Sequence, residues 1–165
     1  MIAGIFDETF GVPTHPLAVH APIVLIPILA IVSIVVLFRR TWRERSAIPL
    51  AGLALVMVVM LFVAKESGES AKAANNVFGD IDRHEDLAGQ TFVLGIVWLV
   101  LAAAVGIAAF VVRRQSTRSV SAAVAPATGA RLVLVLQVLA AVAVVATTVW
   151  LIRTGHAGAE SRWKI

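Results

Sequence analysis

The longest uncharged stretch of the chain covers residues 87–112 and reads LAGQTFVLGIVWLVLAAAVGIAAFVV. It has no Asp, Glu, Lys or Arg, and a helix of about 20 apolar residues is enough to cross the hydrocarbon core of a bilayer. Residues 17–38, 47–64 and 132–152 have the same property. All four stretches are longer than barrel strands and do not alternate between apolar and polar residues. The sequence therefore predicts four transmembrane helices.

The composition agrees with a membrane protein. The chain has 165 residues, of which 59% are hydrophobic and 15% are charged, and its mean hydropathy is +0.92. Soluble domains have about 25% charged residues, so an ordinary soluble enzyme, a disordered tail and a nucleic-acid-binding module are all disfavoured. The chain has no cysteine, which excludes disulfides, thiolate metal sites, iron–sulfur clusters and covalent attachment of haem c.

Four spans with short connections predict an all-α fold, an integral membrane four-helix up-down bundle of antiparallel hairpins with both termini on the same side. Residues 1–165 are expected to form this single domain. The second helix is expected to run past the bilayer and turn near Gly79, and residues 116–130 are expected to be a flexible linker.

The charges differ between the two ends of this bundle. The connections 39–46 and 113–131 are rich in arginine and carry a net charge of +7, whereas residues 1–16, 65–86 and 153–165 together carry −3. The positive-inside rule places the arginine-rich connections in the cytoplasm and both termini outside.

The two halves of the chain share a short and weak sequence similarity. The second and fourth spans end on Ser67-Gly68 and Thr154-Gly155, and in this alignment Glu69 matches His156. Halves that run in the same direction would be related by a twofold axis along the membrane normal.

One face of the third span carries mostly small residues at spacings of three and four. It reads His84, Ala88, Thr91, Gly95, Trp98, Ala102, Gly106 and Ala109. Such a stripe faces inward, where helices approach closely, and it either packs against a neighbour or leaves room for a flat cofactor. Gln137, near the middle of the fourth span, predicts a hydrogen bond between helices.

The four histidines, His15, His20, His84 and His156, all fall on the outer side. Ionisable groups at membrane depth are rare and are candidates for function. Pro16 favours an extended His15 at the rim, while His20 lies one turn deeper and is expected to be the most embedded. The sequence therefore predicts that, if the histidines hold a cofactor, His20→Ala abolishes its retention and His15→Ala does not.

The segment HPLAVHAPI at residues 15–23 resembles the opening signature, His-Pro-Leu-x-Val-His-x-Pro-Ile, of the bacterial four-helix membrane family called domain of unknown function 2231. Ser67-Gly68, His84-Glu85 and Thr154-Gly155-His156-x-Gly158 are similar to its other marks, in the same order. The chain departs from many members after the last glycine, where it reads AESRW at residues 159–163. The resemblance implies a multi-pass protein of the bacterial plasma (inner) membrane. Relatives occur beside Rieske and cytochrome domains, which implies an electron-transfer setting.

Three functions are open. The first is a membrane redox subunit that binds one haem b through His20 and either His84 or His156, with Lys65, Arg83 and Arg153 near the propionates. The second is a copper, zinc or iron site built from His20, His84 and His156 with Glu69 or Glu85. The third is a non-catalytic accessory subunit that binds no cofactor and braces a membrane complex of the respiratory type.

The expected partners are the lipid bilayer and redox or membrane-complex proteins, with no nucleic acid, and a homo-oligomer is left open. The chain is not expected to be an enzyme by itself, because no serine or threonine lies in a recognisable setting with a base.

Overall fold

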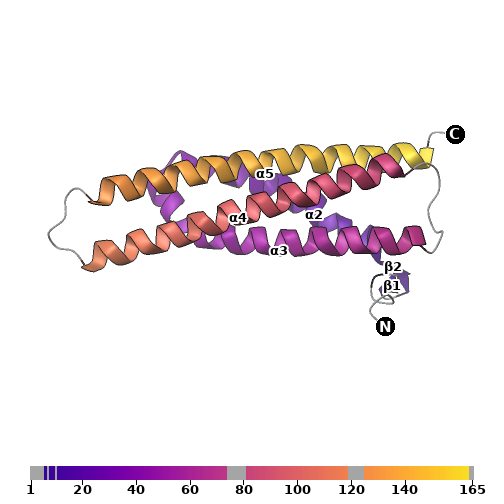
Figure 1. The fold of residues 1–165 in the computed structure, drawn as a ribbon, viewed down its shortest axis with the longest axis horizontal. Helices are drawn as coiled ribbons and strands as arrows, with labels where there is room; N and C mark the ends of the chain where they lie inside the picture. Colours follow the sequence, from indigo (N-terminus) through magenta and orange to yellow (C-terminus); the bar gives the residue numbers. More distant parts are fainter. Residues whose placement is uncertain (1–5, 7, 10, 74–80, 119–124, 164–165) are drawn as a thin grey trace.

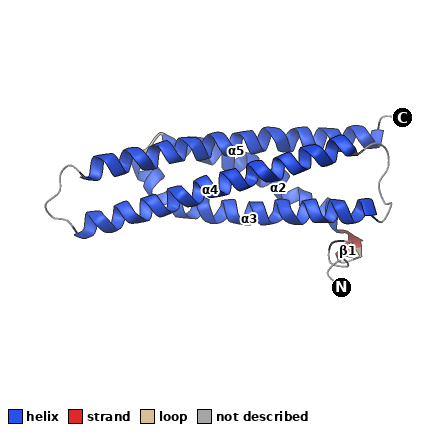
Figure 2. Cartoon of the chain, viewed as in Figure 1, coloured by secondary structure: helices blue, strands red, loops and turns tan. Residues whose placement is uncertain are grey.

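Four long helices form an elongated up-and-down bundle in the computed structural model, which describes residues 6, 8–9, 11–73, 81–118 and 125–163 (Figures 1 and 2). The helices are α2 (Thr14–Leu37), α3 (Arg40–Ala73), α4 (Asp82–Arg118) and α5 (Ala125–Trp163). Each is long and apolar enough to cross a membrane. The predicted all-α four-helix bundle is therefore confirmed.

A short hairpin precedes the bundle. The strands β1 (Glu8–Thr9) and β2 (Val12–Pro13) pair antiparallel, with Thr9 opposite Val12. Gly11 lies between them with a φ of 75°, a left-handed conformation that glycine adopts without a clash.

The start of α2 corrects one expectation. His15 is helical, so the prediction that Pro16 holds it in an extended conformation is wrong. Pro16 is the third residue of α2, and the first four N–H groups of a helix have no partner inside it, so a residue without an N–H fits there. The helix continues through Pro22 and Pro27.

The helices extend beyond the apolar spans. As expected, α3 continues past Ala64 to Ala73, and the predicted turn near Gly79 lies outside the described residues. The prediction of a flexible linker over 116–130 is wrong for 116–118 and 125–130, which are helical, while 119–124 lie outside the described residues. The alanines of this stretch favour helix, and Pro126 falls in the first turn of α5, where proline is tolerated.

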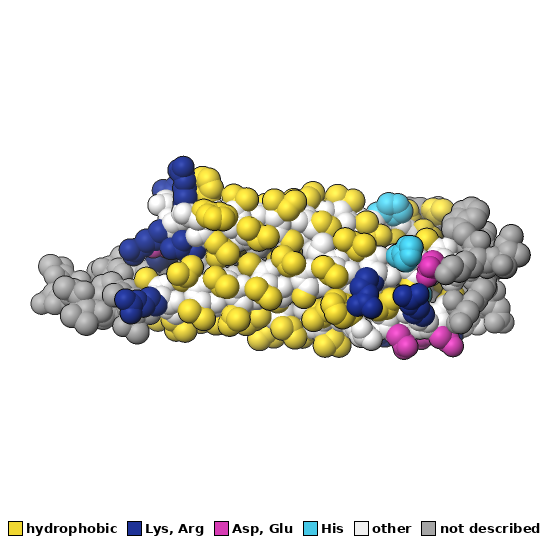
Figure 3. Space-filling view, turned by 90° about the horizontal axis from the view of Figure 1, so that it is seen from above, with side chains coloured by type: hydrophobic (Ala, Val, Ile, Leu, Met, Phe, Trp, Pro, Cys, Tyr) yellow, Lys and Arg dark blue, Asp and Glu magenta, His cyan; other side chains and the backbone are white. Residues whose placement is uncertain are grey.

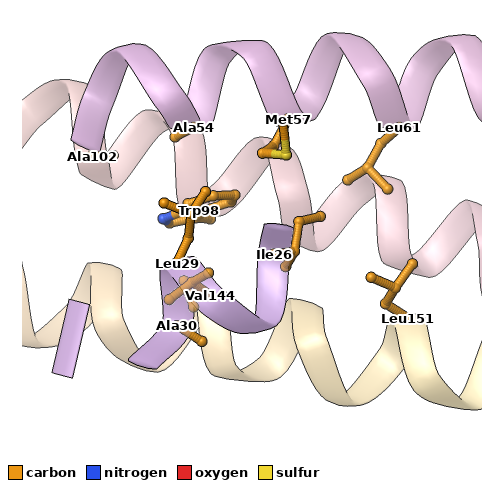
Figure 4. Packing of buried hydrophobic residues seen from close by; sticks show 11 residues of the cluster. Ile26, Leu29, Ala30, Ala54, Met57, Leu61, Trp98, Ala102, Val144 and Leu151 are labelled. Atoms are coloured by element: carbon orange, nitrogen blue, oxygen red, sulfur yellow. The ribbon is translucent and has the colours of Figure 1, made fainter. Parts of the chain in front are cut away.

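The helices pack in a ring in which α2 contacts α3, α3 contacts α4, α4 contacts α5 and α5 contacts α2. Figure 4 shows the buried centre, where Trp98 lies among side chains of the other helices. The cluster comprises Ile26, Leu29, Ala30, Ala54, Met57, Leu61, Trp98, Ala102, Ala143, Val144 and Leu151. Lipid does not drive helices together as water does, so close packing of such side chains holds the bundle.

Two sequence predictions about the interior are confirmed. The stripe of α4 faces inward, with Thr91 and Trp98 each only 2% exposed. At Gly95 an added Cβ would lie 2.8 Å from Leu61 Cδ1, so the glycine lets α3 come close. Gln137 Nε2 donates a hydrogen bond to the Arg43 carbonyl oxygen at 3.0 Å and so joins α5 to α3.

The outer faces of the helices are apolar. Ile31, Val100 and Ile107 are examples of large apolar side chains that are more than half exposed. In Figure 3 an apolar band separates basic side chains at one end, all of them arginine, from a mixture of basic, acidic and histidine side chains at the other. The apolar band is the surface that contacts lipid.

We expect Ala54→Leu to destabilise the protein. Ala54 is fully buried in the centre of the bundle, and three additional carbon atoms there would force neighbouring helices apart at a cost of about 1–3 kcal/mol. Leu55→Ala, on the adjacent lipid-facing position, should change stability little. Thermal unfolding in detergent compares the two variants, and an equal loss in both would contradict this packing.

Candidate functional site

A cavity of about 630 Å³ lies at the end of the bundle where α2 and α4 begin and α3 and α5 end, called here the histidine end. All four helices line it, with apolar walls that include Val19, Pro22, Leu61, Phe92 and Leu151. Two histidines, His15 and His84, also line the cavity. It is therefore a mostly apolar pocket with imidazole groups in its wall.

His15 joins the start of α2 to the end of α3. Its Nδ1 lies 2.9 Å from the Ala64 carbonyl oxygen and 3.3 Å from Ser67 Oγ, and the Ser67 hydroxyl donates to the same carbonyl at 3.0 Å. A carbonyl oxygen only accepts, so His15 Nδ1 carries the proton of this hydrogen bond. In the neutral ring the lone pair is then on Nε2.

His84 makes the same connection in the second hairpin. Its Nδ1 lies 2.9 Å from the Thr154 carbonyl oxygen, so the start of α4 is joined to the end of α5 and Nδ1 again donates. The two rings come together from opposite hairpins, with centres 6.3 Å apart and planes at 87°. The structure therefore brings two imidazoles together, each with Nε2 free of these bonds.

A pair of threonines lies beside His84. Thr91 Oγ1 and Thr154 Oγ1 are 2.9 Å apart in the buried interface between α4 and α5. Each hydroxyl also lies within hydrogen-bond distance of a carbonyl of its own helix, that of Leu87 or Trp150. Because each hydroxyl has one proton, one of them bonds its own helix while the other bridges to the neighbouring helix.

Charged side chains from α3 and α4 line one side of the cavity. Lys65 forms an ion pair with Glu69 along α3, and Lys72 forms one with Glu85 that joins α3 to α4. Lys72 Nζ also lies 3.7 Å from Asp82 Oδ1. This set of Lys65, Glu69, Lys72 and Glu85 is called the charged rim, and exposed pairs of this kind add little stability by themselves.

His20 and His156 do not line the cavity. Both are exposed, and His20 Nδ1 bonds the Pro16 carbonyl oxygen of its own helix. The His156 side chain is 71% exposed, with Nε2 3.5 Å from Glu160 Oε1. The expected order of burial is wrong, since His15 is half-buried and faces the cavity while His20 faces outward.

The predicted set His20, His84 and His156 is therefore not brought together, and His15 was missed. A signal for it was present in the sequence. His15, Val19, Pro22, Ile26, Leu29 and Ser33 have the same spacing as His84, Ala88, Thr91, Gly95, Trp98 and Ala102, the stripe already assigned to the interior.

The other predicted ligands are placed as follows. Lys65 lines the cavity, whereas Arg83 pairs with Glu160 at 3.1 Å and Arg153 lies over the Trp150 ring, and neither lines the cavity. Glu69 and Glu85 belong to the charged rim. Over the described ranges, no three His, Asp or Glu side chains form a group that could hold a metal ion.

Four apolar helices around a two-histidine cavity define a multi-pass membrane protein with a polar site near one end of its bundle. The model of a family described as "Predicted membrane protein (DUF2231)" matches residues 11–165, and the chain belongs to this family. The match confirms the family that the HPLAVHAPI segment suggested. No curated protein and no solved structure matches the chain significantly.

We expect a double-mutant cycle of Thr91→Val and Thr154→Val to show coupling between the two hydroxyls. Hydrogen bonds between membrane helices contribute on average about 0.6 kcal/mol and at most about 1.7 kcal/mol. Thr148 Oγ1 bonds only a carbonyl of its own helix, so Thr148→Val combined with Thr91→Val is the matched control and should be additive. Unfolding in detergent measures both cycles, and additivity in both would argue against the interhelical bond.

Proposed function

We propose that the protein is a membrane redox subunit that binds one haem b in the cavity, where His15 and His84 would hold the iron. The observation that carries the proposal is the convergence of these two imidazoles from separate hairpins, with ring centres 6.3 Å apart. Haem iron held by the protein through two histidines needs no other protein ligand.

The hydrogen bonds of both rings support this assignment. A histidine that ligates a metal usually donates its other ring N–H to a carboxylate, a backbone carbonyl or water, which fixes the tautomer and the orientation of the ring. His15 and His84 each donate Nδ1–H to a backbone carbonyl. Nε2 is therefore the nitrogen that each ring offers to a ligand.

The dimensions of the site also support haem. A bond from a metal to an imidazole nitrogen is about 2 Å long, and the nitrogen is about 1 Å from the centre of its ring. Two imidazoles that held one metal ion between them would therefore have ring centres about 6 Å apart, close to the distance found here. The cavity volume of about 630 Å³ also lies within the range of about 300–1,000 Å³ that is common for cofactor sites.

The site offers two imidazoles, whereas a structural or catalytic zinc site uses three or four protein ligands. This difference favours haem over a bare metal ion. Lys65 and Lys72 of the charged rim would pair with the propionates, in exchange for Glu69 and Glu85. Haem b with two histidine ligands supplies one-electron transfer.

We also infer that the arginine-rich end faces the cytoplasm of a bacterial cell and that the histidine end faces outward. The unequal charge of the connections supports this orientation. Redox or membrane-complex partner proteins would then exchange electrons with the site from the outer side of the plasma membrane.

We expect His15→Ala and His84→Ala each to abolish haem retention. Each substitution removes one of the two imidazoles that face the cavity. His20→Ala and His156→Ala are the matched controls, because both rings are exposed outside the cavity, and they should retain haem. The measurement is the Soret absorbance per protein after purification in detergent from cells that are supplied with haem.

The same preparation separates the alternatives. Wild-type protein without a Soret band but with stoichiometric copper, zinc or iron would replace haem by a bare metal ion. Protein with neither group, under conditions where the bundle is folded, would leave the accessory-subunit hypothesis. Loss of haem in His20→Ala with retention in His15→Ala would reverse the assignment of the ligands.

We expect a reporter enzyme that is active only outside the cytoplasm to be active when fused after Ile165. The C-terminus follows α5 and lies at the histidine end (Figure 1). A fusion within residues 119–124 should be inactive, because α4 ends and α5 begins at the arginine-rich end. The opposite pattern of activities would overturn the orientation.

A further inference from the structure

The two hairpins bury equivalent positions. Each residue of α2 is matched here with the α4 residue whose number is 69 higher, and each residue of α3 with the α5 residue whose number is 90 higher. Under these offsets, many buried residues match buried residues: Pro22 and Thr91, Ile26 and Gly95, Leu29 and Trp98, Ser33 and Ala102, Ala47 and Gln137, Ala54 and Val144, Met57 and Thr147, Leu61 and Leu151. The buried Thr14 and Ala143 are exceptions, since they match the exposed Arg83 and Leu53. The two hairpins therefore bury these faces in the same register, as a pseudo-twofold axis along the bundle would require, although few of the matched residues are identical.

The histidine hydrogen bonds obey the same offsets. His15 matches His84, and their acceptors, Ala64 and Thr154, also match. Three and four residues after these acceptors, the sequence reads Ser67-Gly68 in α3 and Ala157-Gly158 in α5. This register corrects the sequence alignment that paired Ser67 with Thr154, because the hydrogen-bond acceptor lies one turn earlier in α3.

Each glycine lies under an imidazole. A Cβ at Gly68 would be 3.2 Å from both Cε1 and Nδ1 of His15, and a Cβ at Gly158 would be 2.9 Å from Nδ1 and 3.0 Å from Cε1 of His84. The reason is geometric. In an α-helix the carbonyl of residue i points toward the N–H of residue i+4. A ring that reaches this carbonyl from a neighbouring helix therefore lies over residue i+4.

We propose that each hairpin supplies one half of a pseudo-twofold ligand site, in which Gly68 is the positioning residue of His15 and Gly158 is the positioning residue of His84. Each half consists of a histidine at the start of one helix and a carbonyl and a glycine at the end of the next. This proposal deepens the proposed function and rests on it only for the identity of the ligand.

The glycines act through the orientation of the rings. With no Cβ at residue i+4, the imidazole reaches the carbonyl and donates Nδ1–H, so that Nε2 is left for the ligand. A methyl group at Gly158 would occupy the volume of the His84 ring, and one at Gly68 would crowd the His15 ring. The displaced ring loses its hydrogen bond to the carbonyl and, with it, the fixed tautomer.

The test uses Gly68→Ala and Gly158→Ala in the full chain, labelled with ¹⁵N-histidine and purified without haem. Wild-type protein should show protonated Nδ1 and bare Nε2 for His15 and His84, and also for His20, whose Nδ1 bonds the Pro16 carbonyl oxygen. His15→Ala, His84→Ala and His20→Ala assign these signals. Gly68→Ala should remove this signature from His15 alone, and Gly158→Ala from His84 alone. Retention of the signature by His15 in Gly68→Ala, or by His84 in Gly158→Ala, would overturn the proposal.

Gly52→Ala in α3 and Gly89→Ala in α4 are the matched controls. Nothing lies within 4 Å of a Cβ at either position, and neither residue lines the cavity. Both controls replace a helical glycine by the residue with the highest helix propensity, as the test variants do. They should leave both imidazole signals unchanged, and a change as large as that in the test variants would refute a specific role of Gly68 and Gly158.

A second measurement covers a test variant that does not fold. If the methyl group acts by meeting the ring, removing the ring should relieve the effect. Gly158→Ala should therefore lower the melting temperature in wild-type protein but not in His84→Ala, and Gly68→Ala should do so in wild-type protein but not in His15→Ala. When a glycine substitution is combined with loss of the other histidine, such as Gly158→Ala in His15→Ala, the two changes in melting temperature should add. Equal losses in all backgrounds would contradict the proposal.

Haem loading distinguishes this proposal from the proposed function. Gly68→Ala and Gly158→Ala should lose the low-spin spectrum of a bis-histidine haem, while the two control variants keep it. If wild-type protein binds no haem but the ¹⁵N signals change as expected, the haem assignment fails and the positioning role stands. If the wild-type protein binds haem and both glycine variants keep the low-spin spectrum, the positioning role fails and the haem assignment stands.

Discussion

The site depends on one interaction, the hydrogen bond from an imidazole N–H to a helix carbonyl on the neighbouring helix. In each hairpin the two helices are connected at the arginine-rich end, and at the opposite end His15 or His84 joins them. Each bond closes the open end of its hairpin and fixes a ring in the wall of the cavity. The same contact therefore joins the two helices of a hairpin and leaves Nε2 for a ligand, as the proposed function would require.

The parts of the fold that the sequence predicts are those controlled by local composition. Absence of charge over about 20 residues selects a membrane helix wherever it occurs, and the four helices are where those stretches lie. Small residues spaced by three and four in α4 identify the inner face, because the backbones of membrane helices approach closely only there. The interhelical hydrogen bond of Gln137 is predictable for a similar reason, since a polar amide in lipid needs a partner on another helix.

The site was predicted only in part, because depth along a helix does not determine direction around it. His15 and His20 are five residues apart, which turns their side chains by about 140° relative to each other in a helix of 3.6 residues per turn. The deeper histidine therefore faces outward and the shallower one faces the cavity. The glycine register was misplaced for a similar reason. Matching letters aligned Gly68 with Gly155, whereas the structural match to Gly158 follows from the carbonyl four residues earlier.

The twofold relation of the imidazoles does not extend to the rest of the cavity, and this asymmetry bears on what the cavity holds. Lys65 and Glu69 of the charged rim correspond to Gly155 and Ala159, and Glu85 corresponds to Pro16. Lys72 corresponds to Arg162, but among the described residues that line the cavity, the Lys and Glu side chains all belong to α3 and α4. Two equivalent imidazoles would hold a flat ligand from both faces without choosing its rotation in the plane. The one-sided charge would choose it, as a ligand such as haem b requires, since both of its carboxylates lie on one edge.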